Sequence, residues 1–251
     1  MKRYSKQNNY LFLSPIIFVV IWEMVAKLVG NSMIFPNIID IFYSLVEIIK
    51  NENFLVILFN TLKKSVVTLL VSLFLGSVLG VLSYRYKLCY LIFFPFINLI
   101  KSIPTIAVII LVLIWSKVEF VPFFAGTMIV LPIIYENILG GIDSIDKDLI
   151  KMANIYKVSK FLIFKDIYLP AVYFFLASTL SAITGLVLKV IIAGEVLAQD
   201  SLSIGGEIFM GKIYLESANI FAWIIIIIFI NFVAEICIKC LNRRLNSWRK
   251  Q

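Results

Sequence analysis

Long runs of apolar residues alternate with short polar segments along this sequence. A helix rises about 1.5 Å per residue, so roughly 20 apolar residues are needed to cross the hydrocarbon core of a membrane. Runs of about this length or longer lie at about 10–29, 65–83, 88–115, 120–139, 171–196 and 220–240. The pattern therefore predicts an all-α polytopic membrane protein with six transmembrane helices. The first run exceeds the length of a signal-peptide core and no Ala-x-Ala site follows it, so we expect it to remain as a span.

The third run is longer than one crossing needs, and Lys101-Ser102-Ile103-Pro104 interrupts it. Proline lacks a backbone donor and restricts the residue before it, so we expect the helix to bend or break at this point. Irregular backbone at membrane depth is tolerated where it lines a cavity. The segment 101–104 is therefore the leading candidate for the wall of a passage, and a proline kink without contact to solute is the alternative.

Residues 36–50 show a different periodicity, because their apolar side chains recur at helical spacing between charged and polar ones. The apolar positions are Ile38, Ile41, Phe42, Leu45, Ile48 and Ile49. This pattern predicts an amphipathic helix lying along the membrane surface. In the second run, small residues recur every four positions, at Ser72, Gly76 and Gly80. Such a stripe predicts the close approach of another helix.

The charged segment 141–170 between the fourth and fifth runs is too well patterned to be a passive connection. It carries two short helical patterns of apolar residues: Leu149, Ile150, Ala153 and Tyr156, then Phe161, Leu162, Phe164, Ile167 and Tyr168. We expect a folded pair of short helices whose apolar face rests on another surface. That surface is either a partner protein or, as the alternative, the lipid headgroups.

Composition agrees with a membrane protein, since 61% of the residues are hydrophobic and the mean hydropathy is +1.00. The net charge of +8 does not predict nucleic-acid binding, because the basic residues gather at the ends of apolar runs. The chain has no His, which excludes imidazole metal sites and His-based catalytic triads. Cys89, Cys237 and Cys240 lie near run ends without further ligands, so we expect no metal site, no cofactor and no catalytic residue.

The basic residues also predict orientation. Lys and Arg are concentrated in residues 1–9, at Arg85 and Lys87, in the loop 141–170 and in the tail 241–251. Fewer lie on the opposite side, at Lys27, Lys50, Lys63, Lys64, Lys117 and Lys212. By the positive-inside rule, both termini and the loop 141–170 face the cytoplasm, and the helix 36–50 lies outside. Residues 10–240 then form a single transmembrane domain in contact with lipid.

The loop also carries an ordered motif: Lys151-Met152-Ala153, then Lys157, then Ile167 and Leu169-Pro170. This spacing resembles the cytoplasmic coupling loop of binding-protein-dependent ABC importer permeases, which has Glu-Ala-Ala, three residues, Gly, nine residues, Ile, one residue and Leu-Pro. Further segments resemble the branch that serves nitrate, taurine, aliphatic sulfonates and some vitamin precursors. They are residues 61–65, 100–115 and 192–206, with Arg244 and Trp248 in the basic end.

The resemblance implies a type I importer permease fold, a location in the cytoplasmic (inner) membrane of a bacterium and a homodimer of permeases. It also implies two cytosolic ATP-binding cassette ATPase subunits and an extracytoplasmic solute-binding protein as partners. The chain has no GxxxxGK[ST] phosphate loop, so ATP hydrolysis belongs to a partner and this chain is not an enzyme. Two alternatives remain open: the transmembrane coupling subunit of an energy-coupling-factor vitamin transporter, and an ion-driven secondary transporter.

The resemblance also assigns roles within the loop. Residues expected to dock on the ATPase are Leu149, Ile150, Lys151, Met152, Ala153, Tyr156, Lys157, Ile167, Leu169 and Pro170. Two of them depart from the family motif. Lys151 stands at the position of the usual Glu, so we expect acidic groups on the ATPase opposite it. Lys157 stands at the position of the usual Gly, which costs roughly 1–2 kcal/mol if the turn is left-handed.

Charged residues inside membrane spans are costly and usually face protein or water. Residues expected along the translocation path are Lys101, Ser102, Pro104, Lys189 and Glu195. Two lysines near the path would suit a small anionic solute such as a sulfonate or nitrate. In the alternative interpretation, Lys101 and Lys189 pair with carboxylates such as Glu136 and Glu195 and hold helices together. The identity of the solute cannot be read from the sequence.

Overall fold

The computed structural model describes residues 13–245, and these residues form helices and contain no strand. The predicted N-terminal segment 1–9 and the end of the tail, including Trp248, lie outside this range. The helices in chain order are α2 (Leu13–Val29), α3 (Ile38–Lys50), α4 (Phe54–Arg85), α5 (Lys87–Ser102), α6 (Thr105–Trp115), the 3₁₀ turn η1 (Val118–Phe120), α7 (Val121–Asp143), α8 (Lys147–Ile155), α9 (Lys160–Ile163), the π-helical turn η2 (Phe164–Tyr168), α10 (Leu169–Ala198), α11 (Ile204–Ile213) and α12 (Ser217–Leu245).

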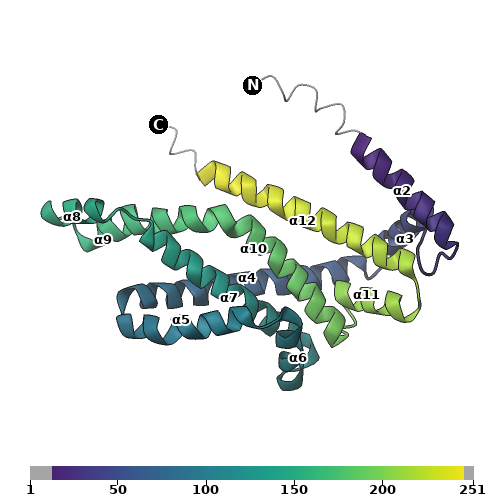
Figure 1. Cartoon of the computed structure of the whole chain (residues 1–251), viewed down its shortest axis with the longest axis horizontal. Helices are drawn as coiled ribbons and strands as arrows, with labels where there is room; N and C mark the ends of the chain where they lie inside the picture. The colour runs from purple at the N-terminus through teal and green to yellow at the C-terminus, as the bar shows by residue number, and fades with distance from the viewer. Residues whose placement is uncertain (1–12, 246–251) are drawn as a thin grey trace.

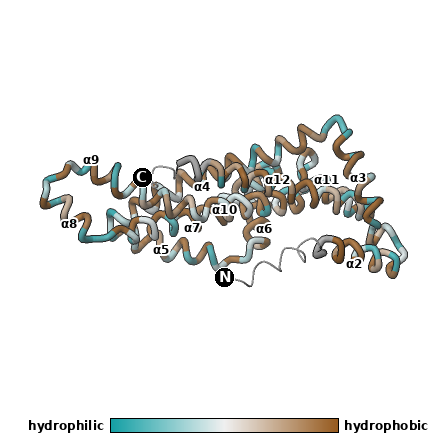
Figure 2. The backbone as a smooth tube through the Cα atoms, turned by 90° about the horizontal axis from the view of Figure 1, so that it is seen from above, coloured by the Kyte–Doolittle hydropathy of each residue, from teal (hydrophilic) through white to brown (hydrophobic). Residues whose placement is uncertain are grey.

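The molecule is elongated, with its long helices running roughly along one direction (Figure 1). The short helices α8 and α9 lie at one end, and α3 and α11 lie towards the other. Hydrophobic residues colour much of the long helices, whereas hydrophilic residues are frequent near α8 and α9 (Figure 2). Many large apolar side chains on the long helices are exposed, as expected for surfaces that face lipid.

Helices α4, α7 and α10 form the centre of the fold. Ile134 and Ile138 of α7 are buried beside α10 residues such as Val187 and Ile191. The predicted small-residue stripe of α4 faces α7: a Cβ atom at Gly76 would lie 2.8 Å from Ile134 Cγ2. Because the stripe leaves no side chain in the way, the two backbones approach closely, as the sequence predicts.

The predicted interruption of the third run is present. Helix α5 ends at Ser102 and α6 begins at Thr105, with the two axes bent by 103°. Ile103 is extended, with φ −80° and ψ 131°, and Pro104 caps α6. The proline therefore breaks the helix outright, in keeping with its effect on the preceding residue.

Within residues 13–245, four continuous helical stretches are long and apolar enough to cross a membrane, and the bent pair α5–α6 would make a fifth. The four are residues 54–85, 118–143, 160–198 and 217–240. Helix α4 starts well before the predicted run 65–83, because TLKKS continues the helix instead of preceding it. The 17 described residues of α2 fall short of this length, and residues 10–12 of the first predicted run are not described. The six-span topology therefore stays a prediction.

Candidate functional site

The loop 141–170 is folded, as its apolar pattern predicts. The Asp146 carboxylate caps α8 by accepting the Asp148 N–H at 2.8 Å, and the Ser159 hydroxyl caps α9 by accepting the Leu162 N–H at 3.3 Å. After α9 the chain passes through the π-helical turn into α10, so residues 160–198 are helical without a break. The loop is thus a short helix, a tight turn and the start of a long helix.

The turn between α8 and α9 depends on Lys157. Its φ of 52° lies in the left-handed region. The Lys157 N–H donates to the Asn154 carbonyl and the Val158 N–H donates to the Ala153 carbonyl, each at 3.0 Å. This pair of bonds is the Schellman motif that commonly ends helices with glycine at the left-handed position. The turn therefore has the shape that favours glycine, although this chain has lysine there.

The predicted docking residues divide into two groups. Leu149, Met152 and Tyr156 are exposed, and Tyr156 is 76% exposed. Lys151 is also exposed, and its ammonium lies 2.8 Å from Asp148 of the same helix. Leu169 also belongs to this exposed group. The second group is half-buried and comprises Ile150, Ala153, Ile167 and Pro170. Helix α8 therefore presents one apolar face outward and rests the other on the protein.

Two tyrosines join the loop to helix α4, and a cavity lies beside them. The hydroxyls of Tyr84 in α4 and Tyr168 lie 3.4 Å apart, with ring centroids 6.0 Å apart. Beside them is a cavity of about 800 Å³ with mostly apolar walls from α4, α7, α8 and α10. Ile150 and Ile163 are among its lining residues. Helix α8 therefore borders the same cavity as these membrane helices.

The α5–α6 break brings Lys101 against a carboxylate. Lys101 Nζ lies 2.6 Å from Glu136 Oε1 of α7, and both side chains are more than a third exposed. Ser102 Oγ donates to the Asn98 carbonyl at 2.9 Å, and Pro104 is exposed. The break thus lies on an open face of the chain, and the positive charge of Lys101 is matched by Glu136. This pairing is the alternative that the sequence left open for Lys101.

Glu195 lies in a different environment from the α5–α6 break. It is fully buried near the end of α10, where its carboxylate meets Lys64 Nζ at 3.0 Å, Thr61 Oγ1 at 3.0 Å and the Gly205 N–H at 3.2 Å. Lys64 also pairs with Asp200 in the turn after α10. A buried carboxylate with these partners is satisfied. The cluster therefore holds α4, α10 and the start of α11 together.

Gly205 makes the cluster around Glu195 possible. A Cβ atom there would lie 2.4 Å from Glu195 Cβ and 2.6 Å from the Val196 nitrogen, so only glycine lets the turn fold back onto α10. Thr61 Oγ1 also accepts the Ile204 N–H at 3.0 Å. The same hydroxyl thus links α4 to both α10 and α11.

The sequence reasoning missed Thr61, Lys64 and Asp200. It placed Lys64 between helices as a marker of orientation, whereas the residue lies inside α4. One signal could have pointed to Lys64: a carboxylate such as Glu195, if buried, needs a cation close to it. Lys189, the other lysine expected on the path, is exposed on α10 and has no ion-pair partner among the residues described. The structure thus separates the five predicted path residues into the α5–α6 break, the exposed Lys189 and the buried Glu195.

Residues 72–247, which are more than half of the chain, match the family of binding-protein-dependent transport system inner membrane components. The chain belongs to this family. It is a permease subunit of an ABC transporter, and the earlier resemblance is confirmed. The permease is a multi-pass inner-membrane protein and a transport component, not an enzyme. Permeases of this family work with ATPase subunits and a substrate-binding protein.

Several curated relatives resemble the permease at low identity over most of their length. The putative aliphatic sulfonates transport permease protein SsuC of Bacillus subtilis is 22% identical, and the match covers 99% of this chain and 90% of the relative. A probable ABC transporter permease protein of Brucella abortus is 21% identical over 88% of both chains. One of Brucella melitensis is 21% identical over 87% of this chain and 89% of its own.

Proposed function

We propose that the permease forms the translocation path of an ATP-driven importer and that α8 and α9 receive the force of ATP hydrolysis from a cytosolic ATPase. The observation that carries the proposal is the exposed apolar face of α8, because a helix at the end of the molecule gains nothing from exposing such a face to water. A short amphipathic helix of this kind fits the helix-in-groove mode of binding.

The arrangement of charges supports the docking residues. Leu149, Met152 and Tyr156 would enter the ATPase groove, while Ile150 and Ala153 transmit the movement to the permease. Lys151 is largely exposed, and within residues 13–245 its ion pair is with Asp148, so its ammonium can also reach acidic groups of the ATPase. Lys157, Ile167, Leu169 and Pro170 fix the turn and the start of α10.

The proposed topology has six spans with both termini in the cytoplasm. Helix α2 supplies the first, the bent pair α5–α6 counts as one, and α4, α7, α10 and α12 are the others. This arrangement puts α8 and α9 on the side of the ATPase and α3 and α11 outside. Two copies of the permease would enclose the path between them, with two ATPase subunits below and a solute-binding protein above.

The path would carry a small anionic or polar solute. Lys189 supports this because it is exposed on a central helix, and Lys101 with Glu136 adds a polar pair at the α5–α6 break. Ser102 and Pro104 would line the same break. Glu195 acts through the position of α10, because it is fully buried. The relative named for aliphatic sulfonates makes a sulfonate the first solute to test.

The test is solute uptake by proteoliposomes that contain the permease with its ATPase, with the binding protein added outside. We expect uptake to require ATP and the binding protein. Tyr156→Glu should lower uptake at least tenfold, because it puts a charge on the docking face. The matched control is Tyr86→Glu between α4 and α5, where a tyrosine is 55% exposed. Equal loss in both variants, or uptake without ATPase, would contradict the proposal.

A further inference from the structure

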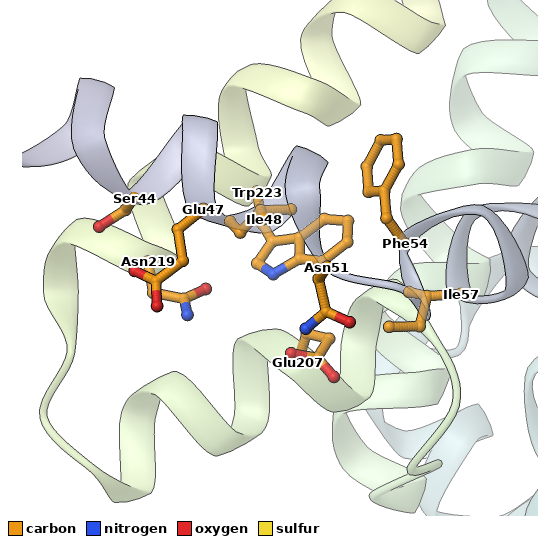
Figure 3. A pocket seen from close by; sticks show the side chains of 9 residues that line it. All are labelled: Ser44, Glu47, Ile48, Asn51, Phe54, Ile57, Glu207, Asn219 and Trp223. Carbon is orange, nitrogen blue, oxygen red and sulfur yellow. The ribbon is translucent and has the colours of Figure 1, made fainter.

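A small cavity of about 90 Å³ lies between α3, the start of α4, α11 and α12, at the end of the molecule away from α8 and α9 (Figures 1 and 3). Its polar lining comes from Ser44, Glu47 and Asn51 around the end of α3, Glu207 of α11 and Asn219 of α12. The indole of Trp223 and the apolar side chains of Ile48, Phe54 and Ile57 complete the wall. Figure 3 shows the polar groups converging from three elements on one space.

The charge of this cavity is negative and unmatched. Glu47 and Glu207 line it, and no Lys or Arg is among its lining residues. Neither carboxylate has an ion-pair partner among the residues that the structure describes. Burial raises the pKa of the Glu207 carboxyl above its ordinary value, because no cation offsets the lost hydration. Glu207 is half-buried and Glu47 is exposed, so a cation entering from solvent would meet Glu47 and offset the burial of Glu207.

Two further polar atoms in the wall have no partner. Trp223 is 1% exposed, and its Nε1–H, which points into the cavity in Figure 3, donates to nothing in the described chain. The Oδ1 atom of Asn219 is likewise buried without a donor. Leaving buried polar groups unpaired costs free energy, so a cavity with such groups is suited to an occupant that pairs with them.

The size of the cavity limits the occupant. Pockets that bind small molecules usually measure 300–1,000 Å³, so about 90 Å³ admits the head of one side chain and not a typical solute. A guanidinium offers five N–H donors in a plane, which matches carboxylate and amide oxygens on several sides. An adjoining main-chain carbonyl of the same loop would accept the Trp223 N–H.

We propose that this cavity receives a basic side chain, Arg or Lys, from a loop of the solute-binding protein, with Glu47, Glu207 and Asn219 as the accepting groups. This inference rests on the proposed function, since it takes the α3–α11 end to be extracytoplasmic. Helix α11, which carries Glu207, begins at Ile204, and its second residue, Gly205, donates its N–H to Glu195. Docking at the cavity would therefore press on the cluster that joins α4 to α10.

The test uses the permease–ATPase complex in nanodiscs and its binding protein, with the dissociation constant measured over a range of salt concentrations. We expect Glu207→Gln and Glu47→Gln each to weaken binding at least fivefold at low salt, and the pair of changes to weaken it further. The salt dependence should become shallower in the variants, because an ion pair has been removed. The matched control is Glu216→Gln, an exposed carboxylate in the α11–α12 turn outside the cavity, which should leave affinity unchanged.

A second measurement identifies the occupant. A photo-crosslinking amino acid at Ser44 should attach to a loop of the binding protein that contains Arg or Lys. Attachment to a second copy of the permease or to lipid would overturn the inference, as would unchanged affinity in both Gln variants. If the binding protein fails to bind or stimulate the unmodified complex, the proposed function itself fails. Binding that is normal and insensitive to Glu47 and Glu207 would refute the cavity alone.

Discussion

At the scale of single residues, Lys157 holds a backbone conformation in which a Cβ atom is unfavourable. The φ of 52° is required by the two hydrogen bonds that end α8, so the strain belongs to the turn itself. Left-handed backbone costs an ordinary residue roughly 1–2 kcal/mol. The sequence predicts this cost if the turn is left-handed, and in the structure the turn is left-handed.

Replacing Lys157 with Gly should therefore raise the free energy of unfolding by about 1 kcal/mol, since glycine tolerates this region freely. Thermal unfolding of the purified permease in detergent would measure the change. Val158→Gly in the same turn is the control, because Val158 does not have a positive φ and should lose stability on becoming glycine. A gain in the control as large as that of Lys157→Gly would refute the explanation.

Glu207 gives a prediction about pH. Its pKa is raised in the folded state by burial, so the folded protein holds this proton more tightly than the unfolded chain. Its contribution to stability is therefore present at low pH and is lost as the pH rises through the folded pKa. Glu207→Gln should raise the melting temperature at pH 8 and leave it nearly unchanged at pH 4. A larger gain at pH 4 would contradict the sign.

At the scale of helices, the contact between α4 and α7 depends on the absence of side chains. A Cβ atom at Gly80 would lie 2.8 Å from both Cβ and Cγ2 of Ile138 and 3.3 Å from the Tyr135 carbonyl oxygen. These are the fixed part of a β-branched side chain and a backbone atom, so neither can turn aside.

Gly80→Ala should accordingly destabilise the permease by about 1–3 kcal/mol, the usual cost of overpacking a buried contact. Ser77→Ala in the same helix, at a half-exposed position, is the control and should change stability by less than about 0.5 kcal/mol. Denaturation in detergent monitored by tryptophan fluorescence would compare them. If Gly80→Ala is not clearly less stable than Ser77→Ala, close packing at Gly80 is not the explanation.

The helices themselves were largely predictable, because apolar runs of this length and the periodicity of residues 36–50 have few other solutions in a membrane. The break at Pro104 and the small-residue stripe of α4 followed from backbone chemistry alone. The extent of α4 did not, since Lys63 and Lys64 looked like a helix boundary. A charged pair can lie within a helix when one member has a partner elsewhere in the fold.

The candidate site was predictable where its residues are neighbours in sequence. The two short helices of the loop and the departure at Lys157 came from spacing within 30 residues. The cluster around Glu195 did not, because Lys64 and Glu195 are 131 positions apart and only the packing of α4 on α10 brings them together. Lys101 and Glu136, 35 positions apart, were one of several pairings that the sequence allowed.

At the scale of the whole molecule, the Lys64–Glu195 cluster joins helices that are distant in sequence. Removing only the cation would leave the buried carboxylate unpaired, so Lys64→Met should cost about 3–5 kcal/mol. Adding Glu195→Gln should recover part of the loss. Thermal unfolding would measure both.

The neighbouring Lys63→Met is the matched control, because Lys63 is exposed and has no ion pair among the described residues. It should behave like the unmodified protein. Equal destabilisation by the two methionine variants would mean that the buried pair does not hold the helices together.

The unbroken helix from Lys160 to Ala198 has a consequence for how distant surfaces communicate. At about 1.5 Å per residue its 39 residues measure roughly 58 Å along the helix axis, with the α8–α9 turn at one end and Glu195 near the other. A continuous helix can transmit a tilt at Phe161 to Glu195 to the extent that its axis does not bend between them. The π-helical turn at Phe164–Tyr168 is a place where it can yield. Stiffening that turn would therefore change how far a movement at the α8–α9 end travels along the helix towards Glu195.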